Sequence, residues 1–148
     1  MVKFESEQQI ARPADEVWAY AADIPRHPEW MGVADARIID GRPTEAGARA
    51  VATMRLGPRR YQLEYVVARA EPGRRIAWSI LGGGPLRGEV VLELDADATG
   101  GTRARYHGEL HTTGAWRVLE PVLAGEIRSG EAMELRRLKT RLESTAGH

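Results

Sequence analysis

Apolar and polar residues alternate along most of the chain, and this alternation predicts β-strands. In the last such segment, Ala104, Tyr106 and Leu110 share one side, and mostly charged residues share the other. Glycine and proline clusters such as Glu71-Pro72-Gly73 separate the segments and predict short turns. Strands joined by short turns form an antiparallel meander. We expect strands over residues 2–10, 34–40, 48–56, 61–68, 75–81, 87–94 and 102–112.

Two short helices are predicted between the first and second strands. Pro13 suits the first turn of a helix, because the N–H that it lacks would have no partner there. Asp15 and Glu16 follow, where acidic side chains favour the positive end of the helix dipole. A second short helix begins at Pro28 and ends at Gly32.

The longest helical pattern lies near the end of the chain, over residues 119–142. Apolar residues recur there at the three- and four-residue spacing of one helix face. Pro121 falls in the first turn and Arg141 in the last, which suits both helix ends. Such a helix covers the apolar side of an antiparallel sheet, so the predicted class is α+β. The predicted apolar stripe comprises Leu119, Val122, Leu123, Ile127, Met133 and Leu138.

Glu126 and Gly130 interrupt this stripe. A glycine inside a helix costs about 1 kcal/mol relative to alanine, and it leaves space beside the helix. One interpretation is a cavity between helix and sheet, with Glu126 at its edge. The other is that Gly130 allows a close backbone approach and that Glu126 points to water, as carboxylates usually do. The sequence leaves both open.

Composition and charge narrow the class of protein. The 148 residues suit one domain spanning 1–148, with 43% hydrophobic residues and a formal net charge of zero. No overall positive charge draws the chain to nucleic acid. Cysteine is missing from the sequence, and no apolar stretch has the length of a membrane span. No secretory signal is visible, so we expect a cytoplasmic protein.

The sequence contains no motif that indicates a bound metal or a cofactor. His107, Glu109 and His111 share one strand face, but residues four apart on a strand lie roughly 13 Å apart. That separation is too large for both histidines to hold one ion. The glycines at 82–84 precede a predicted strand and no Lys-Ser/Thr, so they do not form a phosphate-binding loop. We expect neither a metal nor a cofactor.

Several short motifs, together with the element order, resemble the START-like (SRPBCC) superfamily and within it the polyketide cyclase/dehydrase and lipid-transport branch. The resemblance covers nearly the whole chain. It implies a helix-grip fold, in which a curved antiparallel sheet of six to seven strands wraps around a long C-terminal helix, with two short helices after the first strand. The motifs are Ala11-Arg12-Pro13-Ala14-Asp15-Glu16-Val17-Trp18, Asp23, His27-Pro28-Glu29-Trp30, Glu71-Pro72, Arg75-Ile76-Ala77-Trp78, Gly101-Thr102-Arg103, and Leu135, Leu138, Lys139 and Leu142-Glu143.

The resemblance also implies a hydrophobic cavity between the sheet and the long helix. A ligand in that cavity would be a lipid, a polyketide or a similar apolar metabolite. The residues expected to contact it are Ile24, Trp30, Met54, Tyr61, Tyr65, Trp78, Tyr106, Trp116, Leu123, Ile127, Gly130 and Met133.

Three functions remain open at this point. The first is binding of a hydrophobic small molecule, and the second is a polyketide cyclase/dehydratase acting in the same pocket. For the enzyme, Tyr65, Tyr106 and Glu126 are the candidate acid or base groups. The third is a protein–protein interaction module, for which we expect a filled cavity and an exposed apolar patch. The chain is a monomer or a homodimer in any of these cases.

Overall fold

Seven antiparallel strands form one sheet in the computed structural model, which describes residues 1–56 and 58–144. The order across the sheet is β1-β7-β6-β5-β4-β3-β2, so the first strand pairs with the last. The predicted meander is thereby confirmed. The strands are β1 (Val2–Ile10), β2 (Asp35–Asp40), β3 (Arg49–Leu56), β4 (Arg59–Glu71), β5 (Arg75–Gly82), β6 (Leu86–Ala96) and β7 (Thr102–Thr112).

Helical segments occupy the two predicted places. After β1 come α1 (Ala14–Ala22), the 3-10 helix η1 (Ile24–Arg26) and α2 (His27–Trp30). After β7 come the 3-10 helix η2 (Gly114–Leu119) and the long helix α3 (Glu120–Ser144). Pro13 lies directly before α1, and Asp15 and Glu16 lie in its first turn, as predicted.

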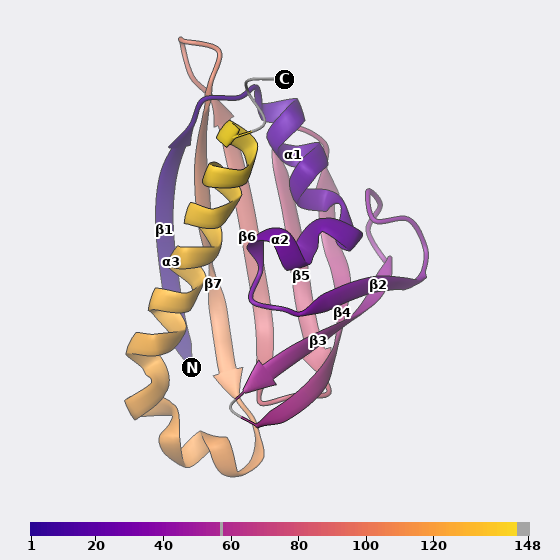
Figure 1. Cartoon of the computed structure of the whole chain (residues 1–148), viewed down its shortest axis with the longest axis vertical. Helices are drawn as coiled ribbons and strands as arrows, with labels where there is room; N and C mark the ends of the chain where they lie inside the picture. Colours follow the sequence, from indigo (N-terminus) through magenta and orange to yellow (C-terminus); the bar gives the residue numbers. More distant parts are fainter. Residues whose placement is uncertain (57, 145–148) are drawn as a thin grey trace.

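The helices cover one face of a bent sheet (Figure 1). Helix α3, drawn orange to yellow, packs along β1 and β7, while α1 packs on β5 and β6 and α2 contacts α3. Trp18 ties α1 to the sheet, because its indole Nε1 donates a hydrogen bond to the carbonyl of Arg75 at 2.9 Å. Irregular register in the β2–β3 and β4–β5 pairs marks bulges, which bend strands.

One glycine on β7 permits a close strand contact. A Cβ at Gly108 would collide with the backbone of Glu89 on β6. A side chain at this position would therefore push β6 and β7 apart.

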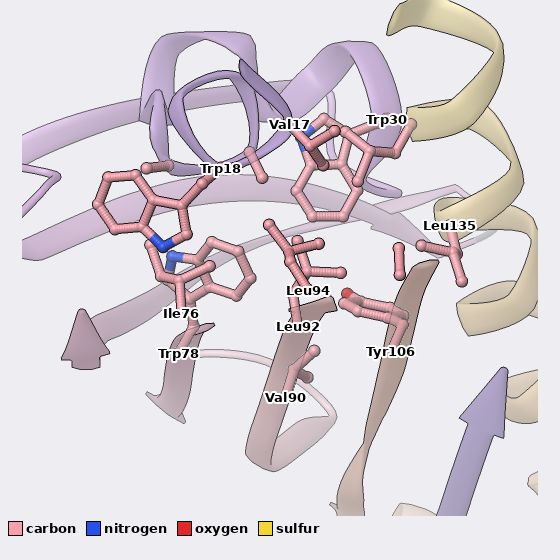
Figure 2. Packing of buried hydrophobic residues seen from close by; sticks show 14 of the residues in the cluster. Val17, Trp18, Trp30, Ile76, Trp78, Val90, Leu92, Leu94, Tyr106 and Leu135 are labelled. Atoms are coloured by element: carbon pink, nitrogen blue, oxygen red, sulfur yellow. The ribbon is translucent and has the colours of Figure 1, made fainter. Parts of the chain in front are cut away.

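The core lies between the sheet and the helices. Trp78, Leu92 and Tyr106 come from three neighbouring strands and extend to the same side, toward Trp30 and Leu135 (Figure 2). Trp30 is fully buried and lies edge-on to Tyr106, with ring centroids 5.9 Å apart. Such contacts between aromatic rings stabilise a core beyond the area that they bury.

The apolar stripe predicted for α3 is right at Leu138 and at the half-buried Leu123 and Ile127, but it is wrong at its other three positions. Leu119, Val122 and Met133 are exposed, and Val122 keeps 77% of its surface accessible. The buried residues of α3 are Leu135, Leu138 and Leu142, all in its second half. The face of α3 that meets the sheet contains Ile127, Glu131 and Leu135. A search for apolar residues alone does not find this face, because Glu131 lies on it.

The second half of α3 should therefore carry the stability of the helix–sheet contact. Leu138 is fully buried, so Leu138→Ala should lower the free energy of unfolding by about 2–5 kcal/mol through lost contacts and a cavity. Val122→Ala, on the exposed half of the same helix, should change it by less than about 0.5 kcal/mol. Urea denaturation of both variants measures the two values, and similar losses would contradict this division of the helix.

Candidate functional site

A small chamber lies between the sheet and the middle of α3, with a volume of about 100 Å³. We call it the inner chamber. Its wall is mostly apolar and is built by strands β3 to β7, the segment after α2, and α3. The apolar side chains on the strands are Ala52, Met54, Leu63, Trp78, Ile80, Leu86 and Val90.

A second chamber of about 270 Å³ adjoins the first and lies toward the start of α3. We call it the outer chamber. Five residues line both chambers, which makes them neighbouring parts of one hollow region: Gly32, Met54, Leu86, Glu131 and Glu134. Gly130 lines the outer chamber, and a Cβ added there would meet no atom within 4 Å. The glycine therefore borders open space.

Two carboxyl groups from α3 enter this apolar region. Glu134 accepts a hydrogen bond from the hydroxyl of Tyr106 at 2.8 Å and another from the backbone N–H of Gly32 at 2.9 Å. Glu131 lies one turn earlier on the same face, and its carboxyl group is in hydrogen-bonding range of both Glu134 and the hydroxyl of Tyr106.

The environment of the pair shifts the pKa values around it. Burial, followed by the charge of Glu134, raises the pKa of Glu131 far above its usual range. Burial and the same charge also raise the pKa of Tyr106 well above its ordinary value. Tyr106 therefore stays a neutral hydrogen-bond donor, and Glu131 keeps a proton at neutral pH.

A buried histidine supports the wall of the inner chamber from behind. His27 Nε2 lies 2.9 Å from the carbonyl oxygen of Ala21, and Nδ1 lies 2.7 Å from the hydroxyl of Tyr65. A carbonyl can only accept, so Nε2 carries the proton and Nδ1 accepts from Tyr65. The ring also meets Trp78 edge-on, with centroids 5.4 Å apart. This contact fixes Tyr65 and Trp78, which line the chamber.

The structure gathers most of the predicted site residues around the two chambers. The inner chamber is lined by Met54, Tyr65, Trp78 and Tyr106, and the outer chamber by Met54, Trp116, Leu123, Glu126, Ile127 and Gly130. Four others lie elsewhere. Ile24 and Trp30 are fully buried in the core beside the chambers, Tyr61 is half-buried on β4, and Met133 is 43% exposed on α3.

Sequence reasoning did not select Glu131 and Glu134. Glu126, the carboxyl that it favoured, is exposed at the outer chamber. One signal in the sequence could have identified them. Residues three or four apart share a helix face, and counting back in such steps from Leu142 and Leu138 leads to Glu134 and then to Glu131. Two glutamates on the otherwise apolar face of a helix indicate a candidate binding site rather than a solvent-exposed face.

Searches for other kinds of site give nothing further in the described ranges. Within residues 1–56 and 58–144, no three His, Asp or Glu side chains converge as metal ligands. In the same ranges, no helix is long and apolar enough to cross a membrane.

The fold and the site together define a helix-grip protein with an internal, largely apolar cavity. Residues 1–143 match the profile of the family described as polyketide cyclase/dehydrase and lipid transport. The chain therefore belongs to this family. Comparison with curated protein sequences finds no match to the chain.

Solved structures share the whole fold at low sequence identity. A START superfamily protein from Mycobacterium smegmatis has a TM-score of 0.82 at 12% identity, over 98% of this chain and 99% of that one. An aromatase/cyclase from a Streptomyces species has a TM-score of 0.79 at 14% identity, over 95% and 93%. A protein from Thermus thermophilus also has a TM-score of 0.79, at 15% identity, over 97% and 98%. The predicted START-like fold is thus confirmed.

Burial of His27 predicts a pH-dependent stability. Burial lowers its pKa from 6.5 to about 4, so the unfolded chain takes up a proton at a higher pH than the folded one. The contribution of neutral His27 to the free energy of unfolding is complete above about pH 6.5. As the pH falls toward 4, this free energy decreases by at most about 3 kcal/mol. The free energy of unfolding, measured by urea denaturation across this range, should fall more steeply in the wild type than in His27→Gln.

The matched control is His111→Gln, because His111 is exposed on β7. It should keep the wild-type pH dependence. If His27→Gln keeps it as well, His27 is not held neutral in the folded protein.

Proposed function

We propose that this protein binds a hydrophobic small molecule in the inner and outer chambers. The observation that carries the proposal is the contrast within the wall of the inner chamber, which is apolar except for Glu131, Glu134 and the hydroxyls of Tyr65 and Tyr106. The outer chamber adds Thr112, Glu126 and Arg137 to large apolar side chains. Ligand pockets in proteins have this composition, with an apolar surface for affinity and a few polar groups for orientation. The family and the fold support the same proposal.

The chambers favour ligand binding over a protein-interaction role. A purely interacting module was expected to have a filled cavity, whereas about 270 Å³ is open in the outer chamber alone. Trp116, Leu123 and Ile127 line that space with large apolar surfaces. An apolar ligand would displace water from them, which is favourable in proportion to the apolar area covered.

A polyketide cyclase/dehydratase is the second candidate. The observation in its favour is that the carboxyl group of Glu131, whose pKa is raised by burial, lies on the cavity wall beside Glu134 and Tyr106. Intramolecular condensation of a poly-β-ketone needs a pocket that folds the chain and a group that moves protons. Loss of water from the product needs the same kind of group.

Filling the space at Gly130 should block the ligand. We expect Gly130→Leu to weaken binding of the neutral fluorescent probe N-phenylnaphthylamine by about tenfold or more, because the new side chain would occupy the outer chamber. Gly125→Leu is the matched control, since Gly125 lies on the same helix and also borders open space but lies outside both chambers. Both changes favour the helix equally. Equal probe affinities in the two variants would contradict the placement of the pocket.

Turnover of a linear poly-β-ketone thioester tests the enzyme. The wild type should give a cyclised, dehydrated product in a ratio that differs from spontaneous cyclisation, as measured by liquid chromatography and mass spectrometry. Glu131→Gln keeps the size of the side chain but carries no transferable proton, so the rate should fall by about a hundredfold. A product ratio equal to the spontaneous one would contradict the activity while leaving ligand binding intact.

A further inference from the structure

Residues 114–126, which join β7 to the first turns of α3, carry the two most exposed large apolar side chains of the described residues. We call this segment the tip. Val118 and Val122 keep 82% and 77% of their surface accessible, and Leu119 between them keeps 46%. Trp116 and Leu123, also in the tip, line the outer chamber, so the tip is apolar both toward the chamber and toward water. A cluster of exposed apolar side chains indicates a contact with a partner or a membrane.

Exposed arginines lie around the tip. The turn between β3 and β4 is at the same end of the molecule as η2 (Figure 1), and Met54, beside that turn, lines the outer chamber together with Trp116. Arg55 and Arg60 lie opposite each other at this turn, with Arg59 next to them, and all three are exposed.

Two further exposed arginines, Arg87 and Arg117, border one hollow of the surface at the end of β7. Among residues 1–56 and 58–144, no carboxylate forms an ion pair with any arginine of this group. The acidic side chains of the hollow and the tip are Glu89, Glu109, Glu120 and Glu126. Two of them are already paired, Glu109 with Lys3 at 3.7 Å and Glu120 with the amino group of Met1 at 2.5 Å. The arginines therefore outnumber the unpaired carboxylates, although the net charge of the chain is zero.

An anionic lipid bilayer matches both features of the tip. Aliphatic side chains on a segment at the end of a molecule can enter the boundary between headgroups and acyl chains, and each nearby arginine adds attraction to the anionic surface. A second copy of the chain matches them poorly. A two-fold contact centred on Val118 would bring Arg117 of both copies together, and like charges repel.

We propose that the tip docks on the surface of anionic lipid bilayers. Val118, Leu119 and Val122 insert below the headgroups, and the surrounding arginines contact the lipid phosphates. Docking does not depend on a ligand in the chambers, so it is measured without one.

Sedimentation of the full chain with lipid vesicles measures the docking. Vesicles of phosphatidylcholine alone are compared with vesicles that contain phosphatidylcholine and phosphatidylglycerol in equal amounts. The wild type should bind the anionic vesicles about tenfold more tightly, because several arginines face their surface. This preference should weaken as salt is added, since salt screens the charges.

A first pair of double variants tests the apolar side chains. Val118→Ser with Val122→Ser should weaken binding to the anionic vesicles by about tenfold or more, because both side chains lose their place in the lipid. The matched control is Ile39→Ser with Met133→Ser, since both residues are exposed and apolar but lie outside the tip. It should change binding by less than about twofold.

A second pair tests the charges. Arg59→Gln with Arg60→Gln should weaken binding by about tenfold at low salt. The control, Arg42→Gln with Arg69→Gln, removes the same net charge from exposed positions at the opposite end of the β3–β4 pair, and it should have little effect. All four double variants should unfold at nearly the wild-type urea concentration, because the changed side chains are exposed.

A dye attached to the tip locates the docked face. The sequence has no cysteine, so Val122→Cys provides a single site for an environment-sensitive fluorophore. Its emission should shift to shorter wavelength with anionic vesicles, whereas the same dye at Ile39→Cys should not respond.

Other results would overturn the proposal. If the wild type binds neither kind of vesicle, the tip is not a membrane-docking surface, whatever the chambers bind. If the tip variants and their controls lose affinity equally, the attraction is general and does not come from the tip. If sedimentation velocity shows a dimer that Val118→Ser with Val122→Ser separates, the tip is an interface between two copies of the chain.

Discussion

The carboxylate of Glu134 is the contact on which the geometry of the cavity depends. It joins three parts of the fold, because it lies on α3 and accepts hydrogen bonds from Tyr106 on β7 and from Gly32 in the segment after α2. Glu134 is half-buried, and hydrogen bonds from two donors stabilise its charged form. The strand, the helix and the segment must therefore meet at this point, and their meeting fixes the separation of helix and sheet beside it. That separation is the space of the inner chamber.

The distribution of large and small side chains explains why the space is not filled. At one end of the cavity, Trp30 and Leu135 pack against the sheet and are fully buried. On β3, by contrast, the buried residues Ala50 and Ala52 contribute very little volume. The first half of α3 leaves Val122 exposed instead of pressing it into the sheet. A protein interior is normally packed to the density of an organic crystal, so small residues opposite an unburied helix half leave a hollow.

The fold was predictable from the sequence because its signals are local. Alternation within strands, prolines at helix starts, and turns such as Glu71-Pro72-Gly73 each depend on a few neighbouring residues. The orientation of α3 was not predictable in this way. The predicted stripe placed Val122 and Met133 inward, whereas both are exposed. The face that points inward carries Glu131 and Glu134. These residues lower its hydrophobicity, so the helical repeat of apolar residues is hard to recognise. Sequence rules fail where polar residues replace core residues, and here Glu131 and Glu134 on the inward face caused the error in helix orientation.

Charge is distributed sparingly around the cavity. His27 contacts Tyr65 behind the wall, and burial lowers its pKa to about 4, so it is neutral at neutral pH. Burial also raises the pKa values of Tyr65 and Glu131, which keeps both in their neutral forms. Among these groups Glu134 holds a charge, and its two donors satisfy it. Glu126 and Arg137 line the outer chamber but not the inner one, so the inner chamber carries fewer charged side chains. The inner chamber is therefore largely apolar, and the hydroxyls of Tyr65 and Tyr106 in its wall are hydrogen-bonded within the protein.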